Sequence, residues 1–174
     1  IDRSIDDPCR DLEVNALAAL RLLEEARRMP GVRIVLASSA AVYGRARGVV
    51  DESHALDPIS PYGVSKLAAE GYARAYVHLH GLSCSIARIA NPYGPLQRRL
   101  VVYEMARQAT TGGGIELRGS GDEVRDFIHA TDVARALDLI AGAGAPIPVS
   151  WDPGGGCGTM PSKPCRRLTT KSWN

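Results

Sequence analysis

The sequence predicts an α/β fold built on a parallel sheet, and three observations support this. Residues 32–36 form an apolar run broken once by an arginine, as in a strand that is covered on both faces. Residues 82–89, Leu-Ser-Cys-Ser-Ile-Ala-Arg-Ile, predict a second parallel strand. Between them, a Ser-Pro pair at 60–61 opens a segment that predicts a helix to about residue 80. A strand, a helix and a second strand in this order are typical of a parallel unit.

The length and composition are those of one globular domain. The chain has 174 residues, of which 45% are hydrophobic and 23% charged, enough for a sizeable core. The net charge is +2, and the excess of basic residues lies after residue 150, so it is poor evidence for a nucleic-acid surface. No apolar run approaches the ~18 residues of a membrane span. We therefore expect a cytoplasmic protein with no membrane, nucleic-acid or metal partner, since the cysteines lack metal-ligand spacing: Cys9, Cys84, Cys157 and Cys165.

The elements before the first strand are helical by pattern. Residues 1–7 show no strand pattern of their own. Leucines and alanines recur at helical spacing from residue 12 to residue 23, which predicts a helix over about 8–28 that ends at Pro30-Gly31. The strand at 32–36 then leads into a serine turn, and residues 44–57 form a polar loop.

The helix at 61–80 carries two residues whose spacing suggests chemistry. Tyr62 and Lys66 are four residues apart, so they share one helix face. The usual pKa of tyrosine is about 10, and a nearby positive charge favours the phenolate, which is a base. Ser39, at the carboxyl end of the first strand, would complete a hydrogen-bonded trio. The structural alternative is a capped helix start with an exposed lysine.

The second half of the chain alternates shorter elements. We predict a helix over about 100–109, a short strand over 115–117, and a last helix that Thr131-Asp132 caps and that runs to about residue 141. Residues 149–174 have no periodicity, which predicts a disordered tail.

Four stretches carry a resemblance to a known family. Ser-Ser-Ala-Ala-Val-Tyr-Gly at 38–44, followed by Pro-Tyr-Gly-Val-Ser-Lys at 61–66, resembles the extended short-chain dehydrogenase/reductases. Within them the chain is most similar to the NAD-dependent epimerase/dehydratase family of the UDP-glucose 4-epimerase kind. Residues 88–95 resemble that family's Arg-x-x-Asn-x-Tyr-Gly-Pro signature, which lines the sugar-nucleotide cleft. Residues 119–129 resemble its Gly-x-Gly-x-x-x-Arg-Asp stretch.

The resemblance implies the C-terminal part of a Rossmann-like doubly wound parallel sheet plus part of a small substrate-binding lobe. Residues 1–90 would be a partial NAD-binding domain with the catalytic residues. Residues 91–148 would mix substrate-binding segments with returning Rossmann elements, and 149–174 would be an atypical tail. The family's first strand and Gly-rich phosphate turn would precede residue 1, and no Gly-x-Gly-x-x-Gly occurs in the chain. We therefore expect an N-terminally truncated fragment without activity of its own.

The resemblance also implies a reaction, the 4-epimerisation of a UDP-hexose through a transient 4-keto sugar with bound NAD. Tyr62 takes the proton of the sugar 4-hydroxyl while hydride passes to the nicotinamide. Lys66 lowers the pKa of Tyr62 and holds the nicotinamide ribose, and Ser39 hydrogen-bonds the reacting oxygen.

Further site residues follow from the same resemblance. Ser38 and Asn15 would contact the cofactor, together with Tyr62 and Lys66. Asn91 and Arg125 would bind the nucleotide sugar, because a guanidinium suits a diphosphate. The structural alternatives are a turn residue at Asn91 and an ordinary surface arginine at Arg125. NADP is an alternative to NAD, and full-length members are expected to form homodimers.

Three other functions stay open from the sequence. Dehydratases of this family carry Thr-Asp-Glu where this chain has Ser39-Ala40-Ala41, and without that acid pair no general acid is evident to expel water. A nucleotide-sugar reductase would differ by consuming NAD(P)H. The rival from another class is a non-catalytic fragment or pseudoenzyme.

Overall fold

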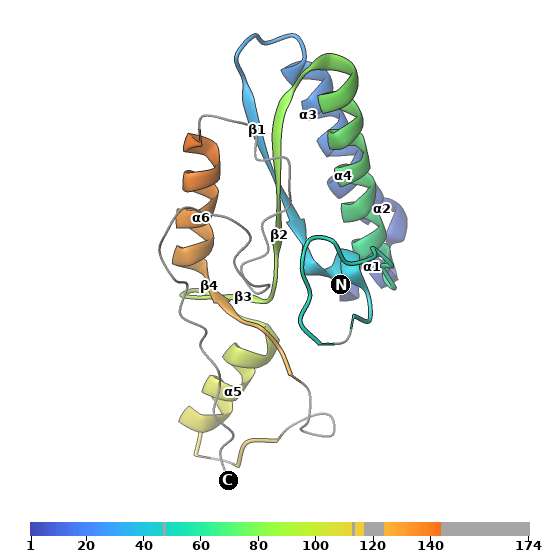
Figure 1. Ribbon diagram of the computed structural model, residues 1–174. Coiled ribbons are helices and arrows are strands. Elements are labelled where there is room, and N and C mark those ends of the chain that lie inside the picture. The colour runs from blue at the N-terminus through green and yellow to red at the C-terminus, as the bar shows by residue number, and fades with distance from the viewer. Residues whose placement is uncertain (47, 113, 117–123, 144–174) are drawn as a thin grey trace.

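Two parallel strands between layers of helices form the centre of the molecule. The computed structural model describes residues 1–46, 48–112, 114–116 and 124–143. Strands β1 (Arg33–Ser39) and β2 (Ser83–Ile89) are joined through helix α4 (Pro61–His80). Helices α3 (Ala18–Ala26) and α4 cover one face, and α6 (Ala130–Gly142) covers the other (Figure 1). The predicted α/β class, with a parallel sheet wound on both faces, is confirmed.

The helix predicted over 8–28 forms in three consecutive pieces. Helix α2 (Pro8–Leu12) is followed by a π-helical turn, η1 (Glu13–Leu17), and then by α3. The carboxylate of Asp7 caps α2 by accepting the N–H of Arg10 at 2.9 Å. A short helix that the sequence pattern did not indicate, α1 (Asp2–Asp6), precedes them. π-turns are frequent at functional sites, and this one contains Asn15.

The register of the sheet brings the candidate residues to one edge. Arg33 of β1 lies opposite Ser83 of β2, and Ser39 lies opposite Ile89. Because both strands are parallel, the chain leaves them at the same edge, where ligands bind in open α/β sheets. After β1 the chain enters a 3₁₀ turn, η2 (Ala40–Tyr43). After β2 it continues directly to Asn91.

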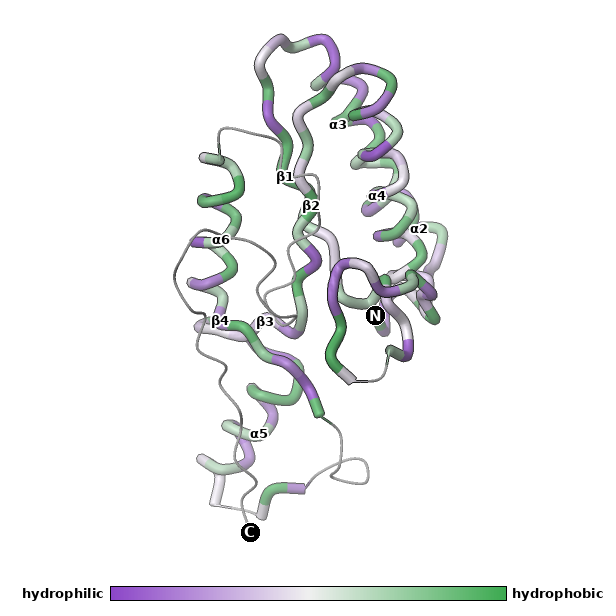
Figure 2. The backbone as a smooth tube through the Cα atoms, viewed as in Figure 1, coloured by the Kyte–Doolittle hydropathy of each residue, from purple (hydrophilic) through white to green (hydrophobic). Residues whose placement is uncertain are grey.

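The apolar core lies between the strands and the helices α3 and α4. Figure 2 shows hydrophobic residues along β1 and β2, between the helical layers. Residues 34 and 36 of β1 pack against this core from their alternate positions. Its fully buried members come from α3, α4, β2 and the residue before β2: Leu23, Ala26, Ala73, Leu82, Cys84 and Ile86.

The buried thiol of Cys84 predicts a loss of stability at alkaline pH. Burial raises the pKa of Cys84 from 9.0 to about 11. The folded-state pKa lies above the unfolded one, so folding favours the protonated thiol. The stability that depends on this protonated thiol is complete below about pH 9 and is lost as the pH rises through 11. At 1.36 kcal/mol per unit, we expect a loss of about 2–3 kcal/mol. Urea unfolding between pH 8 and pH 11 measures it.

The matched variant for this measurement is Cys84→Ala. It lacks the thiol, so its free energy of unfolding should fall less between those two pH values than that of the parent chain. Equal falls in the two proteins would show that the thiol already ionises in the folded state near its usual pKa.

A second pair of strands organises the other half of the chain. Strand β3 (Pro92–Tyr93) pairs in parallel with β4 (Ile128–His129). Helix α5 (Leu100–Thr110), predicted at 100–109, lies beyond this pair, away from β1 and β2 (Figure 1). The prediction of a strand at 115–117 is wrong for residues 115 and 116, and residue 117 lies outside the described residues.

The cap of α6 differs from the prediction. His129, rather than Thr131 or Asp132, precedes the helix, and its ring nitrogen Nδ1 accepts the N–H of Thr131 at 3.3 Å. The predicted tail at 149–174 lies outside the described residues, so its disorder and the domain boundaries stay predictions. In the part of the chain that the structure describes, no helix has the length and apolar character to cross a membrane. Among those same residues, no three His, Cys, Asp or Glu side chains gather to hold a metal ion.

Candidate active site

The first two turns of α4 hold Tyr62 and Lys66 together. The hydroxyl of Ser60 caps the helix by accepting the N–H of Gly63 at 3.1 Å, and Pro61 occupies the first helical position. The Lys66 ammonium lies 5.8 Å from the centre of the Tyr62 ring. The predicted shared face is therefore confirmed, at a distance where the cation and the ring attract each other.

Lys66 also reaches the end of β1. Its Nζ donates to the carbonyl oxygen of Ala37 at 3.1 Å. Ala37 is two residues before Ser39, so this contact places the ammonium near the end of β1. Burial lowers the pKa of Lys66, and the negative charge of Asp11 opposes that shift. The ammonium is thus partly removed from water near the end of β1, where the sequence predicts the catalytic residues.

Ser39 ends β1 and begins the 3₁₀ turn. Its hydroxyl oxygen accepts the N–H of Ala41 at 3.2 Å, which satisfies the first turn of η2. Among the described residues, no hydrogen bond joins the Ser39 hydroxyl to the Tyr62 phenol. The hydrogen-bonded trio of Ser39, Tyr62 and Lys66 therefore stays a prediction, although the structure brings Lys66 to both Tyr62 and the strand that ends at Ser39.

Asn15 and Lys66 are linked through one carboxylate, which the sequence pattern did not single out. Asp11 accepts the Asn15 amide at 3.0 Å through Oδ1 and the Ser65 hydroxyl at 2.5 Å through Oδ2. Ser65 directly precedes Lys66. The contact of Asn15 with a cofactor stays a prediction, but its amide is held next to the helix that carries Tyr62 and Lys66.

We expect Asp11→Asn to lower the pKa of Lys66 further. The carboxylate charge of Asp11 raises that pKa against the effect of burial, and the substitution removes the charge. The chain has three lysines, Lys66, Lys163 and Lys171, so ¹³Cε-lysine labelling gives few resonances to titrate. Lys66→Arg assigns the relevant one.

Asp6→Asn is the matched control for this measurement. Asp6 is exposed and is not a charge that acts on Lys66, so its replacement should leave the Lys66 titration in place. A Lys66 pKa that stays constant or rises in Asp11→Asn would contradict the electrostatic link.

Ser38 is placed differently from Ser39, in a buried polar network. It is 4% exposed, and its hydroxyl donates to Oε1 of Glu70 at 2.6 Å. Arg88 of β2 donates to both oxygens of the same carboxylate, at 2.9 and 2.7 Å, and to the Tyr43 hydroxyl at 2.8 Å. The side chain of Ser38 is thus engaged inside the protein, and a contact with the cofactor stays a prediction.

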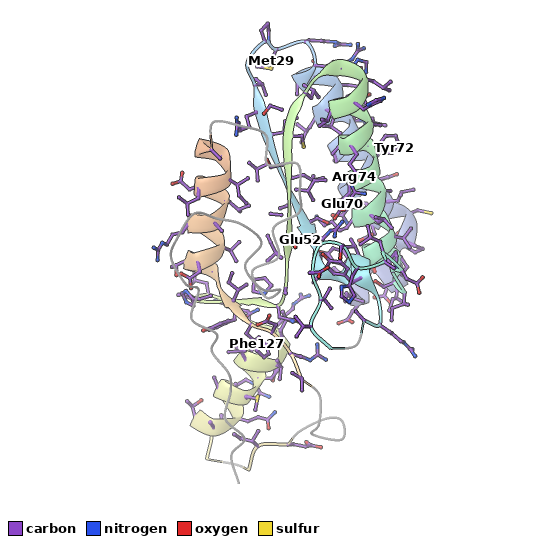
Figure 3. The ribbon with its side chains drawn as sticks, in the orientation of Figure 1. Met29, Glu52, Glu70, Tyr72, Arg74 and Phe127 are labelled. Atoms are coloured by element: carbon purple, nitrogen blue, oxygen red, sulfur yellow. The ribbon has the colours of Figure 1, made fainter. Side chains whose placement is uncertain are left out.

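Arg88, the first residue of the signature at 88–95, is buried beside Ser38 rather than exposed at the end of β2. It is 1% exposed. Burial acts to lower its pKa, but hydrogen bonds to Glu70 and Tyr43 outweigh this, so the pKa of Arg88 is raised and the charge is kept. Figure 3 shows Glu70 on the strand-facing side of α4, whereas Tyr72, which is 43% exposed, projects outward. A charged residue inside a strand that is expected to be buried is the sequence signal for such a pair.

Asn91 and Arg125, both predicted to bind substrate, line one cleft. The pairing of β3 with β4 brings residues 91–93 beside 125–129. The Asn91 amide donates to the carbonyl oxygen of Asp126 at 2.8 Å, and the backbone of Asn91 has a positive φ of 32°. The cleft has a volume of about 190 Å³, and its walls include Tyr93, Leu100 and Phe127. Residues 119–123 of the predicted phosphate stretch lie outside the described residues.

Comparison with known proteins gives matches that cover most of the chain. A family model described as the NAD dependent epimerase/dehydratase family matches residues 1–149. A UDP-glucose 4-epimerase of Mycolicibacterium smegmatis is 35% identical over 153 residues, which are 84% of this chain and 48% of that protein. A dTDP-glucose 4,6-dehydratase of Mycobacterium tuberculosis is 37% identical over 151 residues, 79% of this chain and 44% of the relative.

Solved structures agree with these matches. A double mutant of the dTDP-glucose 4,6-dehydratase from Streptomyces venezuelae, crystallised with NAD and DAU, superposes with a TM-score of 0.79 at 34% identity. The match covers 90% of this chain and 49% of that one. The chain thus spans about half the length of the curated relatives and structures that it matches. The relatives include both epimerases and dehydratases.

Proposed function

The chain belongs to the NAD dependent epimerase/dehydratase family, and from that premise we propose that it carries the catalytic residues of a nucleotide-sugar 4-epimerase acting on a UDP-hexose. The observation that supports this best is the position of Lys66. Its ammonium lies beside the Tyr62 ring and donates to a carbonyl near the end of strand β1, two residues from Ser39. The relatives include UDP-glucose 4-epimerases, and this supports the proposal of a UDP-hexose as the substrate.

In this proposal each residue has a separate task. Tyr62 accepts the proton of the sugar 4-hydroxyl, and the Lys66 ammonium lies 5.8 Å from the centre of its ring. Ser39 donates to the reacting oxygen with its hydroxyl hydrogen, since its oxygen already accepts the N–H of Ala41. Bound NAD would supply the acceptor for the hydrogen on the sugar carbon.

The residues present fit one part of NAD. An ammonium has three N–H donors, and the described contacts of Lys66 use one of them, on Ala37. The two others suit the hydroxyls of the nicotinamide ribose. Asn15, held by Asp11 beside the same helix, adds an amide. The pyrophosphate part needs a Gly-rich turn, and the 174 residues contain no Gly-x-Gly-x-x-Gly.

We therefore expect the chain by itself to bind NAD weakly. The backbone amides of that turn and the helix after it normally hold the pyrophosphate. Isothermal titration calorimetry at micromolar concentrations should show no saturable binding. A micromolar Kd would contradict the expectation and would place a phosphate site within these residues.

Asn91 and Arg125 are proposed to hold the diphosphate side of the substrate. Within the described part of the chain, Arg125 forms no ion pair, so its guanidinium is not committed to a protein carboxylate. It shares a cleft with Asn91 close to the carboxyl end of β2. A charge-assisted contact to an anion in such a place is worth roughly 1.5–3 kcal/mol.

Epimerisation is favoured over dehydration by the residues after Ser39. Loss of water needs a general acid near the leaving hydroxyl. Ala40 and Ala41 end in methyl groups and have no proton to donate. Asp11, a neighbouring acid, is already hydrogen-bonded to Asn15 and Ser65. These groups can move a proton at one sugar oxygen but offer no second acid for dehydration.

The proposal is tested with a chimera. The part of the Mycolicibacterium smegmatis UDP-glucose 4-epimerase that the match leaves uncovered is joined to this chain and incubated with NAD and UDP-glucose. We expect the 4-epimer, with unchanged mass by mass spectrometry and new anomeric signals by NMR. In parallel incubations, loss of one water from added dTDP-glucose would instead show a dehydratase, and net consumption of added NADH would show a reductase. No turnover by a folded, NAD-binding chimera would favour the non-catalytic alternative.

A further inference from the structure

The carboxylate of Glu70 is buried and fully hydrogen-bonded. Its side chain is 0% exposed. Oε1 accepts the Ser38 hydroxyl at 2.6 Å and Nε of Arg88 at 2.9 Å. Oε2 accepts Nη2 of Arg88 at 2.7 Å and Nη2 of Arg74 at 2.9 Å. Four bonds saturate the acceptor sites of one carboxylate, and three of them come from Ser38 and Arg88 inside the protein.

The two inner partners of Glu70 lie at one level of the sheet. Ser38 of β1 and Arg88 of β2 are opposite each other in the strand register. A single carboxylate on α4 therefore holds both strands at the same point. A shift of one residue would present Ser39 and Ile89 to α4 instead, because side chains alternate along a strand. After such a shift the Glu70 carboxylate would face an isoleucine in place of the Arg88 guanidinium, and a buried carboxylate that has lost its cationic partner is costly.

Contacts from α4 and from Arg88 lie on both sides of Ser39. Lys66, one turn before Glu70 on α4, donates to the carbonyl of Ala37, so α4 contacts two consecutive residues of β1. Beyond Ser39, the Tyr43 hydroxyl at the end of η2 accepts Nη1 of Arg88 at 2.8 Å. The guanidinium carbon also lies 4.8 Å from the centre of the Tyr43 ring. Ser39 thus lies between two points that the network holds.

We propose that Glu70 is a positioning residue, whose carboxylate sets the register of β1 against α4 and thereby the place of Ser39 relative to Tyr62 and Lys66. The catalytic meaning of this rests on the proposed function, but the register does not. Stability alone is a weak reason for such a pair, because apolar residues of similar volume often replace a buried ion pair without loss. Selection of one arrangement of the strands is a role that apolar residues at these positions would not fill.

The test uses the whole 174-residue chain with the double substitution Glu70→Met and Arg88→Met. Both side chains keep their approximate length and lose their charge together, so no buried charge is left without a partner. Two readouts report geometry. One is the exchange rate of the Ala41 amide, whose N–H is bonded to Ser39. The other is the titration of the ¹³Cε resonance of Lys66, whose pKa responds to burial and to Asp11, not to the substituted charges.

We expect the double variant to unfold at nearly the parent temperature, with Ala41 exchange about tenfold faster and the Lys66 pKa returned toward its usual value. A folded variant in which both readouts match the parent would overturn the proposal. Neither readout needs substrate or cofactor, so failure of the proposed function would leave the result intact.

Two further variants complete the test. Arg74→Met removes the exposed partner of Glu70 and should leave both readouts at their parent values; a change as large as that of the double variant would overturn the proposal. Ser38→Ala removes the bond between Glu70 and β1 and keeps the ion pair, so it serves if the double variant does not fold. It should move both readouts in the same direction, and unchanged readouts would again overturn the proposal.

Discussion

Replacing Tyr62 with phenylalanine is expected to lower the rate of UDP-hexose epimerisation by the chimera about 10²–10⁴-fold, with substrate binding nearly unchanged. The substitution removes the phenol oxygen and keeps the ring beside Lys66, 5.8 Å from its ammonium. Proton transfer is needed only when the sugar reacts. The diphosphate is proposed to bind elsewhere, near Arg125.

The measurement is kcat and KM for the parent and variant chimeras, followed by NMR of the product. Tyr72→Phe is the matched control, because Tyr72 lies on the same helix but is 43% exposed; its kcat should equal that of the parent. Arg125→Ala should instead raise KM first, since it removes a contact to the bound anion. A Tyr62→Phe enzyme that keeps most of its kcat would show that another group is the base.

Replacing Gly44 with alanine is expected to destabilise the fold by roughly 2–6 kcal/mol, from backbone strain together with overpacking. Gly44 ends the turn η2 with φ 65° and ψ −130°, a region that side chains strongly disfavour. A Cβ atom there would lie 1.8 Å from the carbonyl oxygen of Asp57. Because the obstacle is backbone, a change of side-chain rotamer cannot relieve it.

Gly81→Ala is the control for this substitution. Gly81 has the same φ of 65° and follows α4 as its C-cap, but a Cβ atom added there would meet nothing within 4 Å. Its replacement should cost only about 1–2 kcal/mol, the intrinsic penalty of a left-handed backbone. Urea unfolding of both variants gives the difference. Equal losses would contradict the close approach of the 57–59 segment to the serine turn.

The sequence by itself determined the local geometry of the candidate pair. Ser60 and Pro61 start a helix at a known residue, and a helix places residues four apart on one face, so Tyr62 and Lys66 had to be neighbours. The apolar runs likewise predicted two buried parallel strands. These features depend on short-range propensity and periodicity, which residues a few positions apart carry completely.

Tertiary structure decided which polar groups are paired and where. Ser38 and Glu70 are 32 residues apart, and Arg88 meets Glu70 from the neighbouring strand. The resemblance at 88–95 gave no role to Arg88 by itself, and the structure shows its guanidinium buried. A charged side chain inside the protein needs partners from several elements, and their meeting depends on strand register and helix packing, which no local pattern encodes.

Long-range packing also decided which residues meet in the cleft of Asn91 and Arg125 and around Asp11. Asn91 and Arg125 are drawn to one cleft only because β3 pairs with β4. Asp11 became relevant only when the packing of α2 against α4 brought its carboxylate to Ser65. Sequence therefore specified the residues that carry chemistry, while long-range packing specified their hydrogen-bond partners, because the free energy of a buried polar contact depends on every group around it.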